Sequence, residues 1–188
     1  KGIGPYQVLL GNSRFLLGCH VKGVENVVRY GLTTWVPIYY FEEGGLSIES
    51  TVLLTILLPL GYLAAPPIAG IISDRYLGSR RQPMVIFSCM VSALVLVGIA
   101  LAPPVNVTLG ALLLLIGGLS MGISPMSTVA VDIAGRRMSG TASGLLDAHG
   151  YAYAGAQALI FAAVLDMAGS PWPIVFVVMA VTRVTSGV

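Results

Sequence analysis

The stretch Val21–Tyr40, VKGVENVVRYGLTTWVPIYY, decides how the chain is interpreted. It lies inside the longer run Phe15–Tyr40, which is long enough to cross a bilayer as one helix. Yet Lys22, Glu25 and Arg29 interrupt the run at spacings of three and four residues, so a helix would place them on one face. A charged side chain at mid-bilayer costs at least about 2.5 kcal/mol. The charges therefore predict a polar cavity beside this helix, in which Arg29, the most central, binds an anion.

A structural role for these charges is the alternative interpretation. Glu25 and Arg29 are four residues apart and could form an ion pair that only holds helices together. Lys22 could extend its long side chain to the membrane interface. The two interpretations differ in whether Arg29 is available to a ligand.

The composition is typical of a membrane protein. Of the 188 residues, 56% are hydrophobic and only 10% are charged, against roughly 25% charged residues in soluble domains. The net charge of +2 gives no sign of nucleic-acid binding. Cys19 and Cys89 both lie in apolar runs, so we expect no disulfide framework, no metal site and no cofactor. Because the chain starts at Lys1 and ends within an apolar stretch, we expect a piece of a longer protein.

Six membrane spans are predicted from apolar runs of about 20 residues. Basic residues fall in alternate connections, over residues 1–14, 73–82 and 132–138, whereas the connection 42–49 has glutamates and neither Lys nor Arg. Because positive charge marks the cytoplasmic side, we expect the basic connections to be cytoplasmic. The protein would be an integral multi-pass protein of a plasma or inner membrane. The predicted spans cover residues 15–40, 50–72, 83–102, 108–131, 139–167 and 172–188, the last of them truncated.

The spans differ in how often breaker and polar residues interrupt them. Those over residues 83–102 and 172–188 are more uniformly apolar than the other four, whose middles carry Gly, Pro or polar residues. Interrupted helices at corresponding positions are typical of transport sites. We therefore expect the four interrupted spans to line a cavity and the two apolar spans to face lipid. The first and fourth spans would be equivalent first helices of two three-helix repeats.

The connection after the second span reads GIISDRYLGSRR, over residues 70–81. It resembles the signature of the Major Facilitator Superfamily, G-x-x-x-D-R followed by a glycine and paired basic residues, with one extra residue before the second glycine. The resemblance implies an all-α fold, one six-helix half of a transporter with two inverted three-helix repeats. It also implies that this connection is a cytoplasmic latch for one state of an alternating-access cycle. The matching residues are Gly70, Asp74, Arg75, Gly78, Arg80 and Arg81.

Two further stretches narrow the resemblance to the organophosphate:phosphate antiporters, which include glycerol-3-phosphate and hexose-6-phosphate transporters. Residues 29–40 contain R-Y-G and then W-V-P-I-Y-Y, similar to the seventh helix of that family. Residues 136–151 contain RRMSGTASG and then a Gly-Tyr pair, similar to the start of its eleventh helix. The resemblance covers nearly the whole chain. It implies helices seven to twelve, with the N-terminal six-helix half missing.

This resemblance implies roles for individual residues. Arg29 matches an arginine that binds phosphate together with a second arginine from the missing half. Tyr151 matches a tyrosine that lines the site. Asn26 stands where the glycerol-phosphate members have a tyrosine, which leaves the organophosphate unspecified. Lys22 and Asp147 complete the predicted substrate-binding set, because Asp147 shares a helix face with Tyr151 and could pair with Arg29 or Lys22.

The predicted function is exchange of an organophosphate for inorganic phosphate, without chemistry on the substrate, so the protein is not expected to be an enzyme. A second interpretation is a proton-coupled carrier of an organic anion, in which Asp147 or Glu25 takes the proton. His149 could also titrate there, although a core histidine is the more usual role. A third is a membrane sensor that binds a phosphorylated metabolite without transport, and a fourth is an inactive remnant. The expected partners are the anionic metabolite, phosphate, the lipid bilayer and the missing half, and no nucleic acid.

Overall fold

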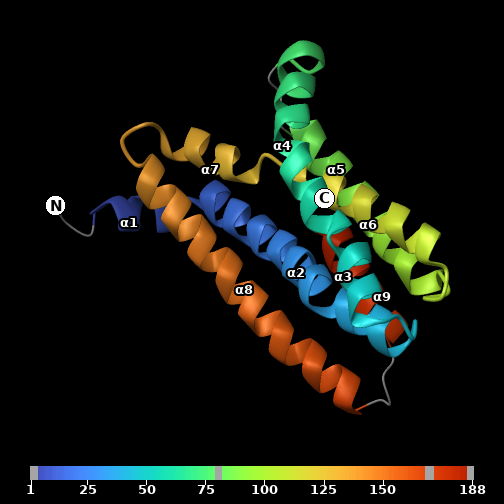
Figure 1. The fold of residues 1–188 in the computed structure, drawn as a ribbon. Helices are drawn as coiled ribbons and strands as arrows, with labels where there is room; N and C mark the ends of the chain where they lie inside the picture. The colour runs from blue at the N-terminus through green and yellow to red at the C-terminus, as the bar shows by residue number, and fades with distance from the viewer. Residues whose placement is uncertain (1–3, 79–81, 168–171, 186–188) are drawn as a thin grey trace.

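The computed structural model describes residues 4–78, 82–167 and 172–185, and these residues contain helices and no strand (Figure 1). The all-α prediction is confirmed. The first helix, α1, lies within the expected polar lead. The helices are α1 (Gly4–Leu10), α2 (Ser13–Glu42), α3 (Ile48–Thr55), α4 (Leu57–Tyr76), α5 (Gln82–Leu101), α6 (Val107–Gly122), α7 (Met126–Ala134), α8 (Ser139–Met167) and α9 (Trp172–Thr185).

Helix α2 is the longest described helix and contains the predicted span 15–40. Its start is fixed by Asn12, whose side-chain oxygen accepts hydrogen bonds from the backbone N–H groups of Arg14 at 3.0 Å and Phe15 at 3.3 Å. A buried stripe of Val28, Leu32 and other apolar residues faces the core. Helix α8 runs beside α2 over much of its length (Figure 1).

Prolines explain where two of the predicted spans break. Pro59 has no N–H to donate to the carbonyl of Thr55, and the chain divides into α3 and α4 just before it. Backbone bonds resume on both sides, from Ile56 N to Val52 O at 3.0 Å and from Leu60 N to Ile56 O at 3.1 Å. The predicted interruption at Pro125 separates α6 from α7 in the same way.

Helices α4 and α6 cross with their backbones in contact. A Cβ atom added to Gly61 would lie only 2.7 Å from the backbone nitrogen of Leu119. One added to Gly118 would clash with the backbone oxygen of Leu58. Small residues at such crossings let helices in a membrane approach closely. This close packing fixes the position of Tyr62, the next residue after Gly61 on α4.

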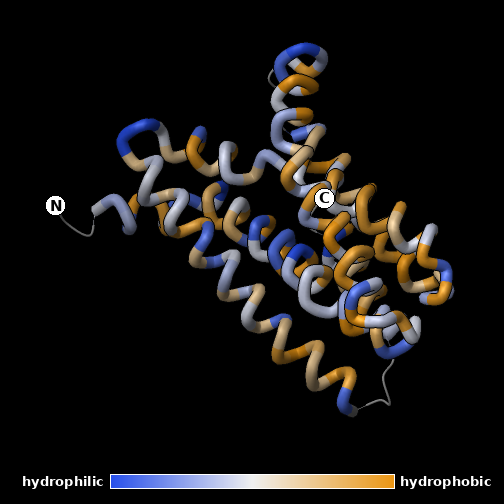
Figure 2. The backbone as a smooth tube through the Cα atoms, in the orientation of Figure 1, coloured by the Kyte–Doolittle hydropathy of each residue, from blue (hydrophilic) through white to orange (hydrophobic). Residues whose placement is uncertain are grey.

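The outer surface suits lipid rather than water. Leu63 on α4, Leu94 on α5 and Leu159 on α8 are 75%, 68% and 76% exposed. Figure 2 shows hydrophobic positions over α5 and α6 and hydrophilic positions in the middle of α2. By length and composition, four described stretches can cross a membrane, and α9 is a shorter apolar helix of 14 residues. These stretches are Ile48–Tyr76, Gln82–Leu101, Val107–Ala134 and Ser139–Asp166.

Candidate functional site

Arg29 lies near the middle of α2 with its side chain exposed. Its guanidinium carbon is 4.7 Å from the centre of the Tyr62 ring, a cation–π arrangement that leaves the outer edge of the guanidinium open to a ligand. The Tyr62 hydroxyl donates to the sulfur of Met121 on α6 at 3.3 Å. Helices α4 and α6 therefore supply and orient the ring on which Arg29 rests.

Lys22 and Glu25, the two charges that share the predicted face of α2 with Arg29, pair with each other. The Nζ of Lys22 is 3.7 Å from a carboxylate oxygen of Glu25, whose side chain is 6% exposed. Glu25 thus takes Lys22 as its partner rather than Arg29, so the structural alternative of a Glu25–Arg29 pair is not what the structure shows. This pairing leaves the guanidinium of Arg29 with an aromatic neighbour instead of a carboxylate.

Helix α8 brings two further predicted residues to the exposed face. Tyr151 is 60% exposed, and its ring lies 5.8 Å from that of Tyr30, the neighbour of Arg29 on α2. Asp147 is exposed one turn earlier on the same face. Among the residues that the structure describes, no ion pair joins Asp147 to Arg29 or to Lys22. Tyr151 on α8 therefore lies beside the residue that follows Arg29 on α2, and the Asp147 side chain is exposed.

His149 and Asn26 occupy more enclosed positions. His149 is half-buried, and its Nδ1 lies 2.8 Å from the backbone oxygen of Leu145, so this nitrogen carries a proton in that contact. Asn26 is 4% exposed in the seam between α2 and α8, where its side chain lies directly against Gly150. Only a glycine leaves room there. Substrate binding by Asn26 and proton transfer by His149 stay predictions.

In the N-terminal half of α2, the aromatic ring of Tyr153 packs between α2 and α8. The Tyr153 ring lies over Gly23, where an added Cβ would be 2.7 Å from the ring. The Tyr153 hydroxyl is 2.9 Å from Nδ1 of His20. These contacts hold α8 at a fixed register on α2, and that register sets Tyr151 beside Tyr30.

The predicted latch lies at the far end of α4 from the break at Pro59. Asp74 and Arg75 are exposed in its last turn, and Gly70 is exposed one turn earlier. Gly78 has φ of +53°, a left-handed conformation that favours glycine and allows the chain to reverse. Arg80 and Arg81 lie outside the described residues.

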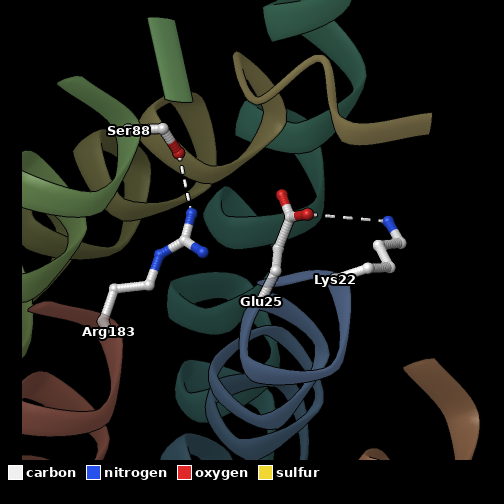
Figure 3. Close-up of polar contacts among 4 residues, drawn as sticks. All are labelled: Lys22, Glu25, Ser88 and Arg183. Carbon is white, nitrogen blue, oxygen red and sulfur yellow. Dashed lines mark hydrogen bonds and ion pairs between the residues drawn. The ribbon is translucent and has the colours of Figure 1, made fainter. Parts of the chain in front are cut away.

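Arg183 is a cation that the sequence prediction missed. It is 1% exposed in α9, and it donates from Nε to Ser92 Oγ at 3.0 Å and from Nη2 to Ser88 Oγ at 2.9 Å (Figure 3). The sequence predicts that the span over residues 172–188 is more uniformly apolar than most and faces lipid, and this buried cation departs from that expectation. The signal was available, because a lone arginine eleven residues after Trp172 invites the argument that singled out Arg29.

A small apolar cavity of about 210 Å³ lies one helical turn beyond Arg29. Leu32 and Thr33 of α2 line it, together with residues at the break between α3 and α4 such as Thr55. The Thr33 hydroxyl donates to the backbone oxygen of Arg29 at 2.8 Å. Within the described ranges, no group of three or more His, Cys, Asp or Glu residues could hold a metal ion.

An all-helical membrane unit with an exposed arginine near the middle of its longest described helix is the class that this fold and site define. The model of the Major Facilitator Superfamily matches residues 24–188, and the chain belongs to that family of membrane transport proteins. Family and apolar helices together make it an integral multi-pass membrane protein. The chain is similar to the glycerol-3-phosphate transporter of Bacillus subtilis (strain 168), with 35% identity over 127 residues. That match covers 66% of this chain and only 28% of the relative.

Proposed function

We propose that the chain forms one half of a secondary transporter that exchanges an organophosphate for inorganic phosphate by alternating access. The observation that carries the proposal is the exposed guanidinium of Arg29, held over Tyr62 rather than against a carboxylate. A guanidinium fork matches two phosphoryl oxygens and stays charged at every working pH. The similarity to a protein named as a glycerol-3-phosphate transporter supports the same substrate class.

The remaining predicted residues have definite roles in this proposal. Tyr151 lines the ligand space beside Arg29, and Lys22 adds positive charge on the same helix. Asp147 faces the other half of the transporter, which closes the cavity and supplies further ligands for the phosphoryl group. The connections over residues 73–82 and 132–138 lie in the cytoplasm. There the latch stabilises the state of the cycle in which the cytoplasmic side is closed.

The substitution Arg29→Lys in the full-length parent protein tests this function. An ammonium head cannot make the two parallel contacts of a guanidinium. Losing one partner of a charge-assisted contact in a desolvated site costs roughly 2–5 kcal/mol. We therefore expect phosphate affinity to fall at least about tenfold, and exchange to be nearly abolished, in a protein that still inserts and folds. Counterflow of labelled phosphate in proteoliposomes measures this.

Lys22→Gln provides the matched control on the same helix. Lys22 lies nearly two turns from Arg29 and is already paired with Glu25, so we expect a smaller loss of exchange. If Arg29→Lys bound phosphate as well as the parent protein does, Arg29 would be a structural cation and the proposed site would be wrong.

A further inference from the structure

The small cavity beyond Arg29 lies on the same face of α2 as Arg29 itself. The α2 residues that line it stand three, four, seven and eight positions after Arg29, and this spacing places side chains on one face of a helix. A charged side chain of a helix in a membrane faces the interior of the bundle or a water-filled cavity, and not lipid. We therefore expect this face of α2 to be turned away from lipid. Its lining residues are Leu32, Thr33, Val36 and Pro37.

Helix α4 contributes both to the cavity and to the support of Arg29. Leu58 and Pro59 line the cavity and stand four and three residues before Tyr62, so the three side chains share a face of α4. The centre of the Tyr62 ring is 4.7 Å from the guanidinium carbon of Arg29. Residues of the neighbouring α3, among them Val52, complete the wall. A molecule whose phosphoryl group binds Arg29 therefore has this cavity beside its remaining atoms.

The polar side chains of the cavity wall are acceptors rather than donors. Of the lining side chains, only those of Thr33 and Thr55 can donate a hydrogen bond. Each donates at 2.8 Å to a backbone oxygen of its own helix, Thr33 to that of Arg29 and Thr55 to that of Thr51. Their lone pairs are left to accept from a hydroxyl group of a ligand. A negatively charged group, by contrast, finds no side-chain donor in this wall, and its burial there is costly.

The volume of the cavity bounds the size of the group that it can hold. The cavity measures about 210 Å³, whereas a water molecule in the liquid occupies about 30 Å³. A methylene group is about as large as a water molecule, so a chain of about three carbons fits well within the cavity. The surrounding Leu, Val, Ile and Pro side chains would remove such a chain from water, which favours binding in proportion to the apolar area buried.

We propose that this cavity is the subsite for the organic group of the transported phosphate ester, and that it selects an uncharged alkyl or hydroxyalkyl group over one with a second negative charge. The inference rests on the proposed function, because it takes Arg29 as the phosphoryl contact. It adds the class of substrate: a phosphate monoester of a small uncharged chain, with any hydroxyl group donating to Thr33 or Thr55.

Alkyl phosphates of increasing length isolate the contribution of the cavity. Near pH 8, well above the second phosphate pKa of about 6, methyl, ethyl and propyl phosphate carry the same dianionic group. Their inhibition constants are measured against phosphate binding to the purified full-length parent protein. We expect affinity to rise about threefold with each methylene, and so roughly tenfold from methyl to propyl phosphate. With a terminal carboxylate on a chain of the same length, 2-carboxyethyl phosphate should bind at least about tenfold more weakly than propyl phosphate.

Two neighbouring positions of α3 provide a variant and its matched control. Val52 lines the cavity and is 57% exposed, so Val52→Phe places a ring in the cavity without disturbing a packed core. Leu53 is 72% exposed and does not line the cavity. We expect Val52→Phe to reduce the roughly tenfold preference for propyl over methyl phosphate to about twofold or less, while phosphate affinity is retained. Leu53→Phe should keep the preference of the parent protein.

Equal affinities for methyl and propyl phosphate in the parent protein would overturn this inference, because a lipid chain or the other half would then fill the cavity. An unchanged preference in a folded Val52→Phe protein would also overturn it. If that variant does not fold, Val52→Leu decides, and no fall in the preference there has the same meaning. A parent protein that binds phosphate, and loses that binding in Arg29→Lys, keeps the proposed function whatever the alkyl series does. A parent protein that binds neither phosphate nor any alkyl phosphate overturns the proposed function and this inference together.

Discussion

Tyr62 is the residue that sets the direction in which Arg29 points, because the guanidinium lies over its ring. Tyr62→Phe keeps the ring face and removes the hydroxyl, which donates to the sulfur of Met121. Tyr62→Leu removes the aromatic face, and a cation–π contact is worth about 0.5–2 kcal/mol. We expect phosphate affinity close to that of the parent in the Phe variant and a loss of about threefold or more in the Leu variant, measured by equilibrium binding.

The two Tyr62 variants also separate two accounts of the ring. If the hydroxyl, which donates to the sulfur of Met121, were the important group, the Phe variant would lose as much affinity as the Leu variant. Equal losses would therefore contradict the role of the ring as a platform for Arg29.

Single residues of this site differ in how far the sequence could predict them. Arg29 was predictable, because a charge in the middle of an apolar run has a high cost and demands an explanation. Tyr62 carries no such signal, since a tyrosine in an apolar helix is ordinary and only the tertiary fold places its ring under Arg29. Arg183 had the same signal as Arg29. Its burial against two serines, however, depends on how α9 packs on α5.

At the level of elements, the α4–α6 crossing depends on having no side chain at Gly61. A Cβ atom there would meet the backbone of α6 at Gly118 and Leu119, which cannot move aside as a flexible side chain can. Overpacking of this kind typically costs about 1–3 kcal/mol. We expect Gly61→Ala to lower the thermal unfolding temperature of the purified full-length protein.

Gly70→Ala is the matched control on the same helix. No atom lies within 4 Å of a Cβ added at Gly70, so the substitution introduces no clash. In a helix, alanine is favoured over glycine by roughly 0.5–1 kcal/mol. The unfolding temperature of this variant should hold or rise. A similar drop in both variants would show that α4 tolerates no substitution at all, and that the crossing itself is not the cause.

The connection after α4 is proposed to act on the cycle rather than on binding. Asp74 and Arg75 are exposed at the end of α4, about three turns after Tyr62 on the same helix. We expect Asp74→Asn to slow exchange in the full-length parent protein with little change in equilibrium phosphate affinity, because it removes a charge that stabilises one face of the cycle. Binding and exchange measured on the same preparation check this. Weak binding with normal turnover would refute the latch role.

The helix breaks show which elements the sequence defines by itself. The interruption at Pro125 was predicted and separates α6 from α7, because proline removes a backbone donor whatever its neighbours are. Pro37 has the same chemistry, yet α2 continues through it to Glu42. The difference lies in packing: Val36, Tyr39 and Tyr40 around Pro37 are buried against the core and hold the last turns in place. Local sequence alone does not contain that information.

At the scale of the whole molecule, polar and charged residues mark the face that a second half would cover. Arg29 and Asp147 are exposed in helices whose other faces are buried, and Tyr151 is exposed beside them. The all-helical membrane architecture could be predicted from the sequence, because span length and breaker residues follow from the solvent properties of a bilayer. The family could be predicted only from the resemblance of residues 70–81 to a known motif. The relation of α2 to α8 could not, since it depends on the fit between glycines and the side chains of Asn26 and Tyr153.

Orientation in the membrane gives a test of the whole arrangement. Glu43 follows α2 in a connection that carries glutamates and neither Lys nor Arg, and Arg136 lies in a basic connection between α7 and α8. Between these two positions lie three of the stretches that are long and apolar enough to cross a membrane. Three crossings would put the two positions on opposite sides, and we expect Arg136 in the cytoplasm because of the excess of positive charge in its connection.

Cysteines introduced at these two exposed positions report the side directly. The native Cys19 and Cys89 are each 1% exposed, so they should add little background. We expect a membrane-impermeant thiol reagent to label Glu43→Cys in intact cells, and to label Arg136→Cys only after the membrane is opened. The reverse pattern would invert the orientation and move the latch out of the cytoplasm. Labelling of both positions from one side would require an even number of crossings between them, which three spanning stretches do not provide.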